Sequence, residues 1–300
     1  MILFSRNVVD PTQLRALTAA IRAALPPDAV IAVDQEGGRV ARLRPPHWRA
    51  HPPAAAIGAL SREAGLRAAW LTGALIGADC AEAGISLVCA PVLDLRVPGA
   101  SDVIGDRAYA SNPAAVAALG AAMAEGLLAA GVQPVAKHAP GHGRALLDSH
   151  HALPSIPAAA SLDPDTAPFA ACTWLPWMMT AHLLYLGLDP DRPGTLSPLV
   201  IEHVIRGRIG FGGVLVSDDL AMRALSGTPG ALAAAAIQAG CDLALHCTGV
   251  LDESTDVLRS VPHLPPRSLA RMRAGAARAA ASRISLHPGA LAAERDRLLA

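Results

Sequence analysis

Ionisable side chains gather in one segment of this 300-residue chain, residues 137–154, which reads KHAPGHGRALLDSHHALP. The segment holds one lysine, four histidines and one aspartate, interrupted by two glycines and two prolines. Because proline removes a backbone donor and glycine permits irregular backbone, the pattern predicts a loop rather than a helix or a regular strand. An apolar run, 132–136, leads directly into it. A histidine-dense loop on such a scaffold favours a catalytic or binding role over a solvated surface loop.

One carboxylate–imidazole pair in this loop has the spacing of a proton-transfer group. Asp148 lies two residues before His150. An aspartate that accepts a hydrogen bond from one ring nitrogen fixes the tautomer and raises the basicity of the other. With an unperturbed pKa of about 6.5, such a histidine suits general acid/base catalysis near neutral pH. We interpret His151 as a bystander and His142, between two glycines, as a brace for the loop.

A second candidate group follows the apolar run 29–33, where Asp34 and Glu36 precede two glycines. Glycine lets a ligand approach the backbone closely, so these carboxylates could bind sugar hydroxyls or a metal ion. The alternative is a turn with two solvated acids, and the pattern alone leaves both interpretations open.

Two adjacent carboxylates, Asp218 and Asp219, end the apolar run 213–216. Neighbouring residues on a strand point to opposite faces, so only one of them can face the centre of a barrel squarely. That one could act as a nucleophile on a sugar anomeric carbon, as a metal ligand or as a general base. We expect the other to cap the following helix, and the spacing does not decide which residue has which role.

Short apolar runs alternate with helical segments along the whole chain. The predicted strands are Ile2–Phe4, Ala29–Val33, Ile85–Leu95, Val132–Ala136, Trp177–Ala181, Gly213–Val216 and Leu243–Leu245. Such non-alternating runs are typical of parallel strands buried on both faces, and polar residues follow their ends. The pattern predicts one α/β domain over residues 1–300, either a (β/α)8 TIM-type barrel or an open doubly wound sheet. A closed barrel of this type needs eight strands. The seven predicted strands therefore indicate that the barrel lacks its first βα unit, or that another segment or subunit closes the barrel.

The amino-acid composition argues against nucleic acid and membranes as partners. Lysine plus arginine and aspartate plus glutamate each number 25, so no global field recruits nucleic acid or anionic lipid. Neither a basic leader nor an apolar stretch of about 18 residues occurs, and we expect no membrane partner. Five scattered cysteines fit buried free thiols in a reducing compartment, which predicts a cytoplasmic protein. The P-loop, Gly-X-Ser-X-Gly and HEXXH motifs are all missing.

Seven stretches together resemble glycoside hydrolase family three, and within it the bacterial β-N-acetylhexosaminidase branch. They are IAVDQEGGRVARL, APVLDL, VIGDRAY, VAKHAPGHGRALLDSHHALP, MTAHLLY, GFGGVLVSDDLAM and AIQAGCDLALHC. They occur in the order and with the spacing of the family, from about Ile2 to Cys247. The family has a strand and a helix before the segment ILFSRN, which agrees with the count of seven.

The resemblance implies a retaining exo-β-N-acetylglucosaminidase with a TIM-type barrel and without metal or cofactor. It makes Asp218 the nucleophile that forms a covalent glycosyl-enzyme, His150 the general acid/base and Asp148 its partner. Five residues are implied to contact the N-acetylglucosamine unit: Asp34, Arg42, Arg107, Lys137 and His138. The implied substrate is an N-acetylglucosamine-containing disaccharide or muropeptide from cell-wall recycling.

Three other functions stay open at this stage. A histidine acid/base becomes neutral after giving up its proton, so the same site could admit phosphate in place of water and act as a phosphorylase. A barrel without its first strand could bind an amino sugar and not turn it over. Less favoured is a metal-dependent hydrolase that uses His138, His182, His246 and Asp218.

Overall fold

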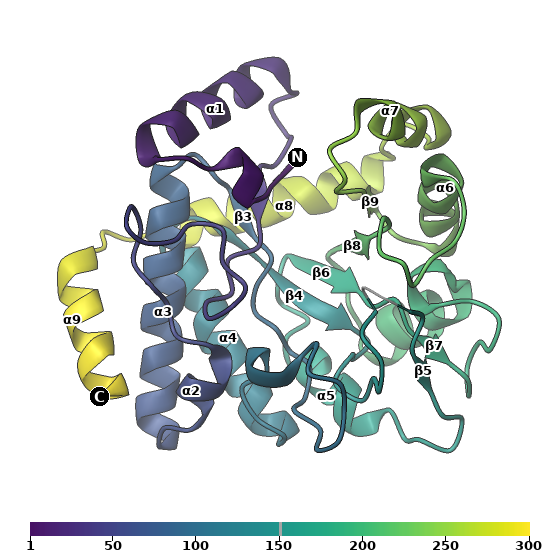
Figure 1. Ribbon diagram of the computed structural model, residues 1–300, viewed down its shortest axis with the longest axis horizontal. Coiled ribbons are helices and arrows are strands. Elements are labelled where there is room, and N and C mark those ends of the chain that lie inside the picture. Colours follow the sequence, from purple (N-terminus) through teal and green to yellow (C-terminus); the bar gives the residue numbers. More distant parts are fainter. Residues whose placement is uncertain (150–151) are drawn as a thin grey trace.

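A curled, wholly parallel sheet of seven strands is the centre of the protein (Figure 1). The computed structural model describes residues 1–149 and 152–300. Within them the strand order is β1-β2-β3-β4-β6-β8-β9, so strands that follow one another in the sheet also follow one another in the chain. The bounds are β1 Ile2–Leu3, β2 Ala32–Val33, β3 Leu87–Val88, β4 Gln133–Ala139, β6 Trp177–Thr180, β8 Val214–Asp219 and β9 Leu243–Leu245. Two short strands, β5 (Ser155–Ile156) and β7 (Leu184–Tyr185), pair separately.

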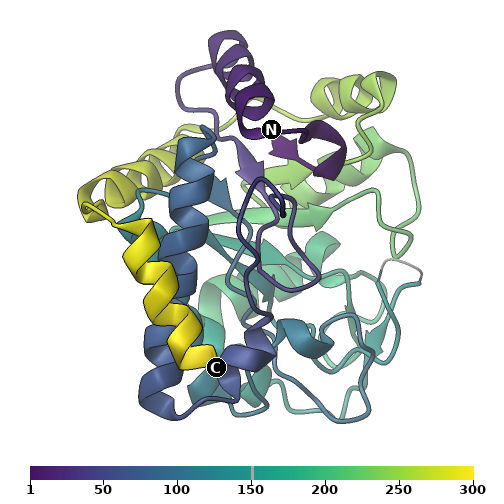
Figure 2. The same ribbon diagram turned by 60° about the vertical axis from the view of Figure 1, so that its left-hand side comes forward.

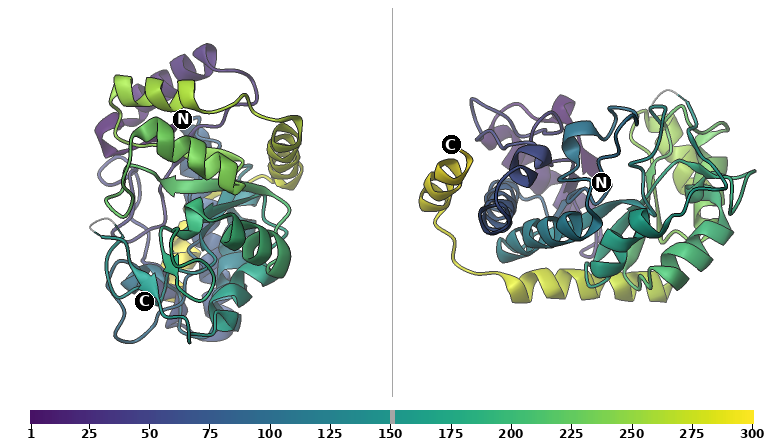
Figure 3. Two further views of the ribbon diagram at one scale, coloured as in Figure 1. Left: turned by 90° about the vertical axis from the view of Figure 1, so that its right-hand side faces the viewer. Right: turned by 90° about the horizontal axis from the view of Figure 1, so that it is seen from below.

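Helices connect the strands and cover the outside of the sheet. They are α1 Pro11–Ala24, α2 Ala54–Gly58, α3 Arg62–Glu82, α4 Pro113–Ala129, α5 Asp163–Ala171, α6 Pro229–Ala239, α7 Leu251–Ser260, α8 Pro266–Ser282 and α9 Pro288–Leu299. A π-helical segment, Val200–Arg208, lies between β7 and β8. Figure 2 shows α9 alongside α3, and Figure 3 shows α8 running beneath the sheet, where it contacts β4 and β8. In the described part of the chain, none of the helices combines the length and the apolar character that a membrane span requires.

Capping residues explain where several helices begin. Asp10 accepts hydrogen bonds from the backbone N–H groups of Thr12 and Gln13 at the start of α1, with a proline at the first helical position. Asn112 and Thr228 cap α4 and α6 in the same way. Asp, Asn and Thr are among the residue types that commonly cap helix N-termini, because their side-chain oxygens accept from the first free backbone N–H groups.

Helices α3 and α4 pack closely because small residues face each other along their contact. A Cβ on Gly73 would lie 2.0 Å from the carbonyl oxygen of Met123, and one on Gly126 would lie 2.1 Å from that of Trp70. Larger side chains would force the two helices apart. The core of the protein then lies between this helical layer and the sheet, and all five cysteines are buried, as predicted.

The seven predicted strands are present, but several of their predicted bounds are wrong: β2 is shorter than predicted, β8 continues to Asp219, and β3 and β4 differ most in what they mean for the site. Residues Lys137, His138 and Ala139 belong to β4 and not to the loop, because pairing with β6 continues to Ala139 through an irregular register. The long run 85–95 contributes only the two residues of β3 to the sheet. Both errors come from long-range contacts, which a local apolar count does not contain.

The sheet has β1 and β9 as its outer strands in the described residues, so an eight-stranded closed barrel is not observed there. One side chain connects the ends of these two outer strands. Arg6, just after β1, donates a hydrogen bond of 2.6 Å to the carbonyl oxygen of Cys247, just after β9. The curled sheet thus has its carboxyl ends gathered on one side, where the polar residues that follow the strands meet.

Candidate active site

A polar cavity of about 250 Å³ lies at the carboxyl ends of the parallel strands. Sixteen residues line it: Asp34, Glu36, Arg39, Val40, Arg42, Val103, Ile104, Arg107, Lys137, His138, His142, Asp148, Ser149, Met179, Asp218 and Met222. All of the site residues expected from the sequence are among them except His150, which lies outside the described residues. Parallel strands bring residues that are far apart in the chain to one edge, which is why these groups meet.

A buried network of ion pairs forms one wall of the cavity. The ammonium group of Lys137, almost fully buried, lies 3.0 Å from Asp34 and 2.7 Å from Glu36. Arg107 forms a two-point contact with Glu36, with N···O distances of 2.8 and 2.9 Å. Arg42 lies 3.0 Å from the other oxygen of Asp34. The two acids are therefore not solvated turn residues.

Charge pairing keeps this network ionised in spite of its burial. Burial alone would raise the pKa of Glu36, but Lys137 and Arg107 hold that pKa well below its ordinary value. Burial would likewise lower the pKa of Lys137, and Asp34 and Glu36 raise it above its ordinary value instead. Opposite charges within about 4 Å in a low-dielectric site have this effect. The wall thus offers fixed charged donors and acceptors to a polar ligand.

His138 is held by a carboxylate that no solvent reaches. Its Nδ1 lies 2.6 Å from Asp94, which follows β3 and has no exposed surface. Its Nε2 lies 3.5 Å from a guanidinium nitrogen of Arg107. Asp94 also accepts a hydrogen bond of 2.6 Å from the backbone N–H of His142.

The two adjacent aspartates at the end of β8 have different surroundings. Asp218 lines the cavity, and its carboxylate accepts a hydrogen bond of 2.8 Å from the backbone N–H of Asp219. Asp219 instead accepts hydrogen bonds from the backbone N–H groups of Ala221 and Cys247, each 3.0 Å long, and so ties β8 to the segment after β9. The structure thus separates the pair as the strand geometry predicts, with Asp218 on the cavity side.

The carboxyl group of Asp218 is ionised near neutral pH. Burial would raise its pKa, but His138 and His182 lower it below the ordinary value. The backbone N–H of Asp218 donates to the hydroxyl of Thr180, 3.4 Å away. An ionised carboxylate in a cavity lined by hydrogen-bond donors can act as a nucleophile or stabilise a developing positive charge.

His182 supports the strand end from behind. Its Nδ1 lies 2.7 Å from the hydroxyl of Thr195 and its Nε2 lies 3.0 Å from the carbonyl oxygen of Asp219. His246 is paired with Glu253 at 2.9 Å. Both histidines are thus bound to other groups of the protein. This argues against a metal site formed by His138, His182, His246 and Asp218. Among residues 1–149 and 152–300, no group of three or more His, Cys, Asp and Glu residues is placed to hold a metal ion.

The loop after β4 closes the cavity from the other side. Asp148 and Ser149 line it, and the hydroxyl of Ser149 lies 2.9 Å from Nε2 of His142. His142 is therefore a brace within the loop, as the sequence predicts, and it also lines the cavity. The expected pairing of Asp148 with His150 and the bystander role of His151 fall on residues outside the described ranges and stay predictions.

His142 makes the stability of the protein sensitive to acid. Burial, and then the neighbouring His138, lower the pKa of His142 to about 4, whereas an unfolded histidine has a pKa of about 6.5. Between these values the unfolded chain binds more protons, so stability is complete above about pH 6.5 and falls toward pH 4. We expect the titration of His142 to lower the free energy of unfolding by about 2 kcal/mol at pH 5, compared with its value above pH 6.5.

Urea unfolding at pH 7.5 and pH 5.0 checks this expectation. The wild type should lose more stability between the two values than His142→Gln, which cannot titrate. His51 and His182 also have pKa values lowered by burial, and they are the same in both proteins. Equal losses in the two proteins would contradict the assignment to His142.

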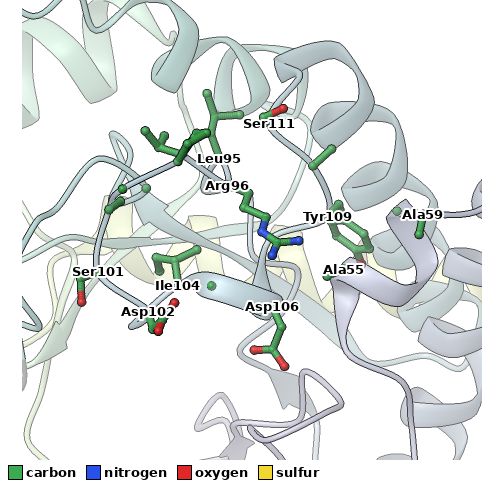
Figure 4. A pocket seen from close by; sticks show the side chains of 18 of the residues that line it. Ala55, Ala59, Leu95, Arg96, Ser101, Asp102, Ile104, Asp106, Tyr109 and Ser111 are labelled. Carbon is green, nitrogen blue, oxygen red and sulfur yellow. The ribbon is translucent and has the colours of Figure 1, made fainter.

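A second, larger cavity of about 980 Å³ adjoins the first and shares Arg39 and Ile104 with it (Figure 4). Most of its lining residues belong to the segment 95–111, and Figure 4 shows the side chain of Arg96 among them. Arg39 separates the two spaces, because its guanidinium is bound to Asp106 and to the carbonyl oxygens of the segment 102–104. The ionised carboxylates and histidines converge on the smaller cavity, which we therefore regard as the candidate active site.

One polar residue that organises this site, Asp94, is not among the candidates that the sequence predicts, because it lies inside the long apolar run 85–95. Glu36 is among them, but the sequence leaves its role open. The signal for Asp94 was a single acidic residue within that run, which is costly to bury without partners. His51 is buried as well, and a guanidinium nitrogen of Arg295 in α9 lies 2.9 Å from its Nδ1.

The fold and the cavity define a parallel α/β protein whose polar site lies at the carboxyl ends of its strands, with the ionised carboxylates of Glu36 and Asp218 in its lining. Residues 1–270 match the Glycosyl hydrolase family 3 N terminal domain, and the chain belongs to this family of glycoside hydrolases.

Similar proteins agree with this family. The Beta-hexosaminidase of Methylococcus capsulatus is 44% identical over 253 residues, which cover 82% of this chain and 75% of that protein. The crystal structure of NagZ from Neisseria gonorrhoeae in complex with N-trifluoroacetyl-D-glucosamine has a TM-score of 0.86 and 32% identity, covering 100% of this chain and 90% of that one. A family 3 beta-N-acetylglucosaminidase from Paenibacillus sp. has a TM-score of 0.85 and 33% identity, and its match covers 99% of this chain. This chain spans only 61% of the Paenibacillus protein.

Proposed function

We propose that the protein is a retaining exo-β-N-acetylglucosaminidase that releases terminal N-acetylglucosamine from peptidoglycan-derived fragments. The ionised carboxylate of Asp218, at the wall of a small polar cavity, carries this proposal. A cavity of about 250 Å³ suits one sugar ring rather than a chain, which fits removal of a terminal unit. The similarity to a protein in complex with an N-acetylglucosamine analogue supports the choice of sugar.

In this proposal the charged wall binds the sugar. Lys137 and Arg107 donate hydrogen bonds to hydroxyl and amide oxygens, and Asp34 accepts them from hydroxyl groups. Arg42 and His138 complete the contacts. These side chains are already fixed by the ion pairs of Lys137 and Arg107 with Asp34 and Glu36, so binding orders few groups.

Two displacements at the anomeric carbon give retention of configuration. An oxygen of Asp218 bonds to that carbon while its bond to the glycosidic oxygen breaks, and protonated His150 gives its proton to the departing oxygen. Neutral His150 then takes a proton from water, whose oxygen displaces Asp218. Asp148 is proposed to orient His150, and its position at the cavity supports a loop that reaches the sugar.

The same proposal includes a barrel architecture, a single domain and a location in the cytoplasm. Similarity to the family supports a (β/α)8-type barrel as the architecture to which the curled sheet corresponds, with residues 1–300 as one domain. Five buried cysteines suit a reducing compartment, which supports a cytoplasmic enzyme of cell-wall recycling.

Turnover of 4-nitrophenyl β-N-acetylglucosaminide tests this function. We expect release of N-acetylglucosamine with the β configuration first, seen by proton NMR, and little turnover of the matching β-glucoside. N-acetylglucosamine 1-phosphate in phosphate buffer would instead identify a phosphorylase. Sugar binding by calorimetry without turnover under either condition would contradict the proposed enzyme and favour an amino-sugar-binding protein.

A further inference from the structure

Asp94 is the most deeply enclosed carboxylate beside the active site. It follows β3 and its exposed surface is 0%. Its two oxygens accept from donors at the end of β4 and in the loop after it. One oxygen lies 2.6 Å from Nδ1 of His138, and the other accepts the backbone N–H of His142 at 2.6 Å. The backbone N–H of His138 is directed at the same carboxylate, 3.2 to 3.3 Å away.

This arrangement decides which nitrogen of His138 is protonated. Burial would raise the pKa of Asp94, but His138 and then His142 lower it, so the carboxylate is ionised and can only accept. At 2.6 Å the facing Nδ1 must therefore donate its proton. Nε2 is left on the cavity side, beside Arg107. A carboxylate that fixes a histidine in this way is known from many catalytic and metal sites.

The second oxygen acts on a different part of the site. His142 is the fourth residue after His138, at the start of the loop that continues to Asp148 and Ser149 along the cavity. Its backbone N–H is bound to Asp94, and its ring is bound to Ser149. One carboxylate thus holds both the strand end and the beginning of the loop.

We propose that Asp94 is a positioning residue of the reaction, which aims Nε2 of His138 at the sugar and anchors the loop that carries Asp148. The assignment rests on the proposed function, because His138 is taken there as a sugar contact. Asp94 has no exposed surface and is not among the residues that line the cavity, so in this proposal it acts through its neighbours.

Histidine-selective ¹⁵N NMR of the wild type tests the first half of the inference without any need for activity. The signals of His138 are assigned by their loss in His138→Gln. We expect Nδ1 of His138 to be protonated from pH 6 to pH 8. A wild-type His138 with an unprotonated Nδ1 would overturn the proposal, whatever the enzyme turns over.

Asp94→Asn tests the consequence for the reaction. The amide keeps the shape of the carboxylate but brings an NH₂ group against the backbone donors of His138 and His142. We expect kcat/KM to fall by about 10- to 100-fold, the usual loss for such supporting partners. KM and the inhibition constant of N-acetylglucosamine should both rise, and the NMR signature of His138 should change.

Asp242→Asn is the matched control. Asp242 is another buried carboxylate with several donors, including Arg206 and the backbone N–H of Leu215, but it precedes β9 at the opposite end of the strands. Its replacement should lower the melting temperature while KM and the His138 signals stay unchanged. An Asp94→Asn protein that keeps wild-type KM and His138 signals would refute the proposal, as would equal effects on KM from both variants. A wild type that is inactive on the chromogenic substrate but shows the expected tautomer would instead count against the proposed function alone.

Discussion

Asp218→Ala is expected to lower kcat/KM for 4-nitrophenyl β-N-acetylglucosaminide by about 10³- to 10⁵-fold, as is common when a residue that acts covalently is removed. The expectation follows from the position of the Asp218 carboxylate, which is ionised and lines the sugar-sized cavity. In the proposed mechanism a carboxylate oxygen of Asp218 forms the glycosyl-enzyme, and alanine has no oxygen to take its place. Steady-state rates with the purified variant measure the loss.

Azide distinguishes a missing nucleophile from a damaged fold. In the space left by the Asp218 carboxylate, azide can bond to the anomeric carbon as nitrophenolate departs. A single displacement inverts the configuration, so the expected product is the α-glycosyl azide, formed faster as azide is added. The wild type should give no such product.

Asp219→Asn is the control for this experiment, because Asp219 is the neighbouring residue and carries the same carboxylate group as Asp218. Asp219 is occupied by the backbone N–H groups of Ala221 and Cys247, so its replacement should affect stability more than rate. A large loss of rate in Asp219→Asn together with an active Asp218→Ala protein would reverse the assignment. Loss in both, with azide rescue in neither, would mean that neither carboxylate is the nucleophile.

The sequence predicted the features that depend on local pattern. Buried parallel strands appear as short apolar runs, and the polar residues after them meet because parallel strands share one carboxyl edge. For this reason Asp34, Lys137 and Asp218, which are separated by many residues, could be expected together. The alternation of neighbouring side chains on β8 also indicated that Asp218 and Asp219 would have different roles, although not which role each would have.

The remaining features depend on contacts between distant segments. The sequence predicts that the fourth strand ends at Ala136, because the prolines and glycines of residues 137–154 favour a loop. In the structure Asp34 and Glu36 neutralise Lys137, and Asp94 binds His138, so the strand continues. No local pattern contains those carboxylates.

Glu36→Gln is expected to destabilise the protein by about 3–5 kcal/mol, the usual cost of leaving a buried charge without its partner. The Glu36 carboxylate lies between the ammonium group of Lys137 and the guanidinium of Arg107, and all three side chains are at most 10% exposed. Glutamine has nearly the same shape, so the change removes the charge and leaves the packing. Lys137 then keeps its ion pair with Asp34, whereas Arg107 loses its two-point contact with a carboxylate. KM should rise because both cations lose part of the orientation with which they are proposed to bind the sugar.

Glu294→Gln is the matched control for Glu36→Gln. Glu294 also makes a two-point contact with an arginine, Arg67, at 2.7 and 2.8 Å, but this pair is largely exposed on the surface. Exposed pairs contribute little, so urea unfolding should show only a small fraction of the loss seen for Glu36→Gln. Because an unfolded glutamate has a pKa of about 4.3 and that of folded Glu36 lies far below it, the stabilisation by Glu36 is complete above pH 4.3 and lost in acid. The difference between wild type and Glu36→Gln should therefore be the same at pH 6 and pH 8, and equal effects of the two substitutions would show that burial does not strengthen the ion pairs of the site.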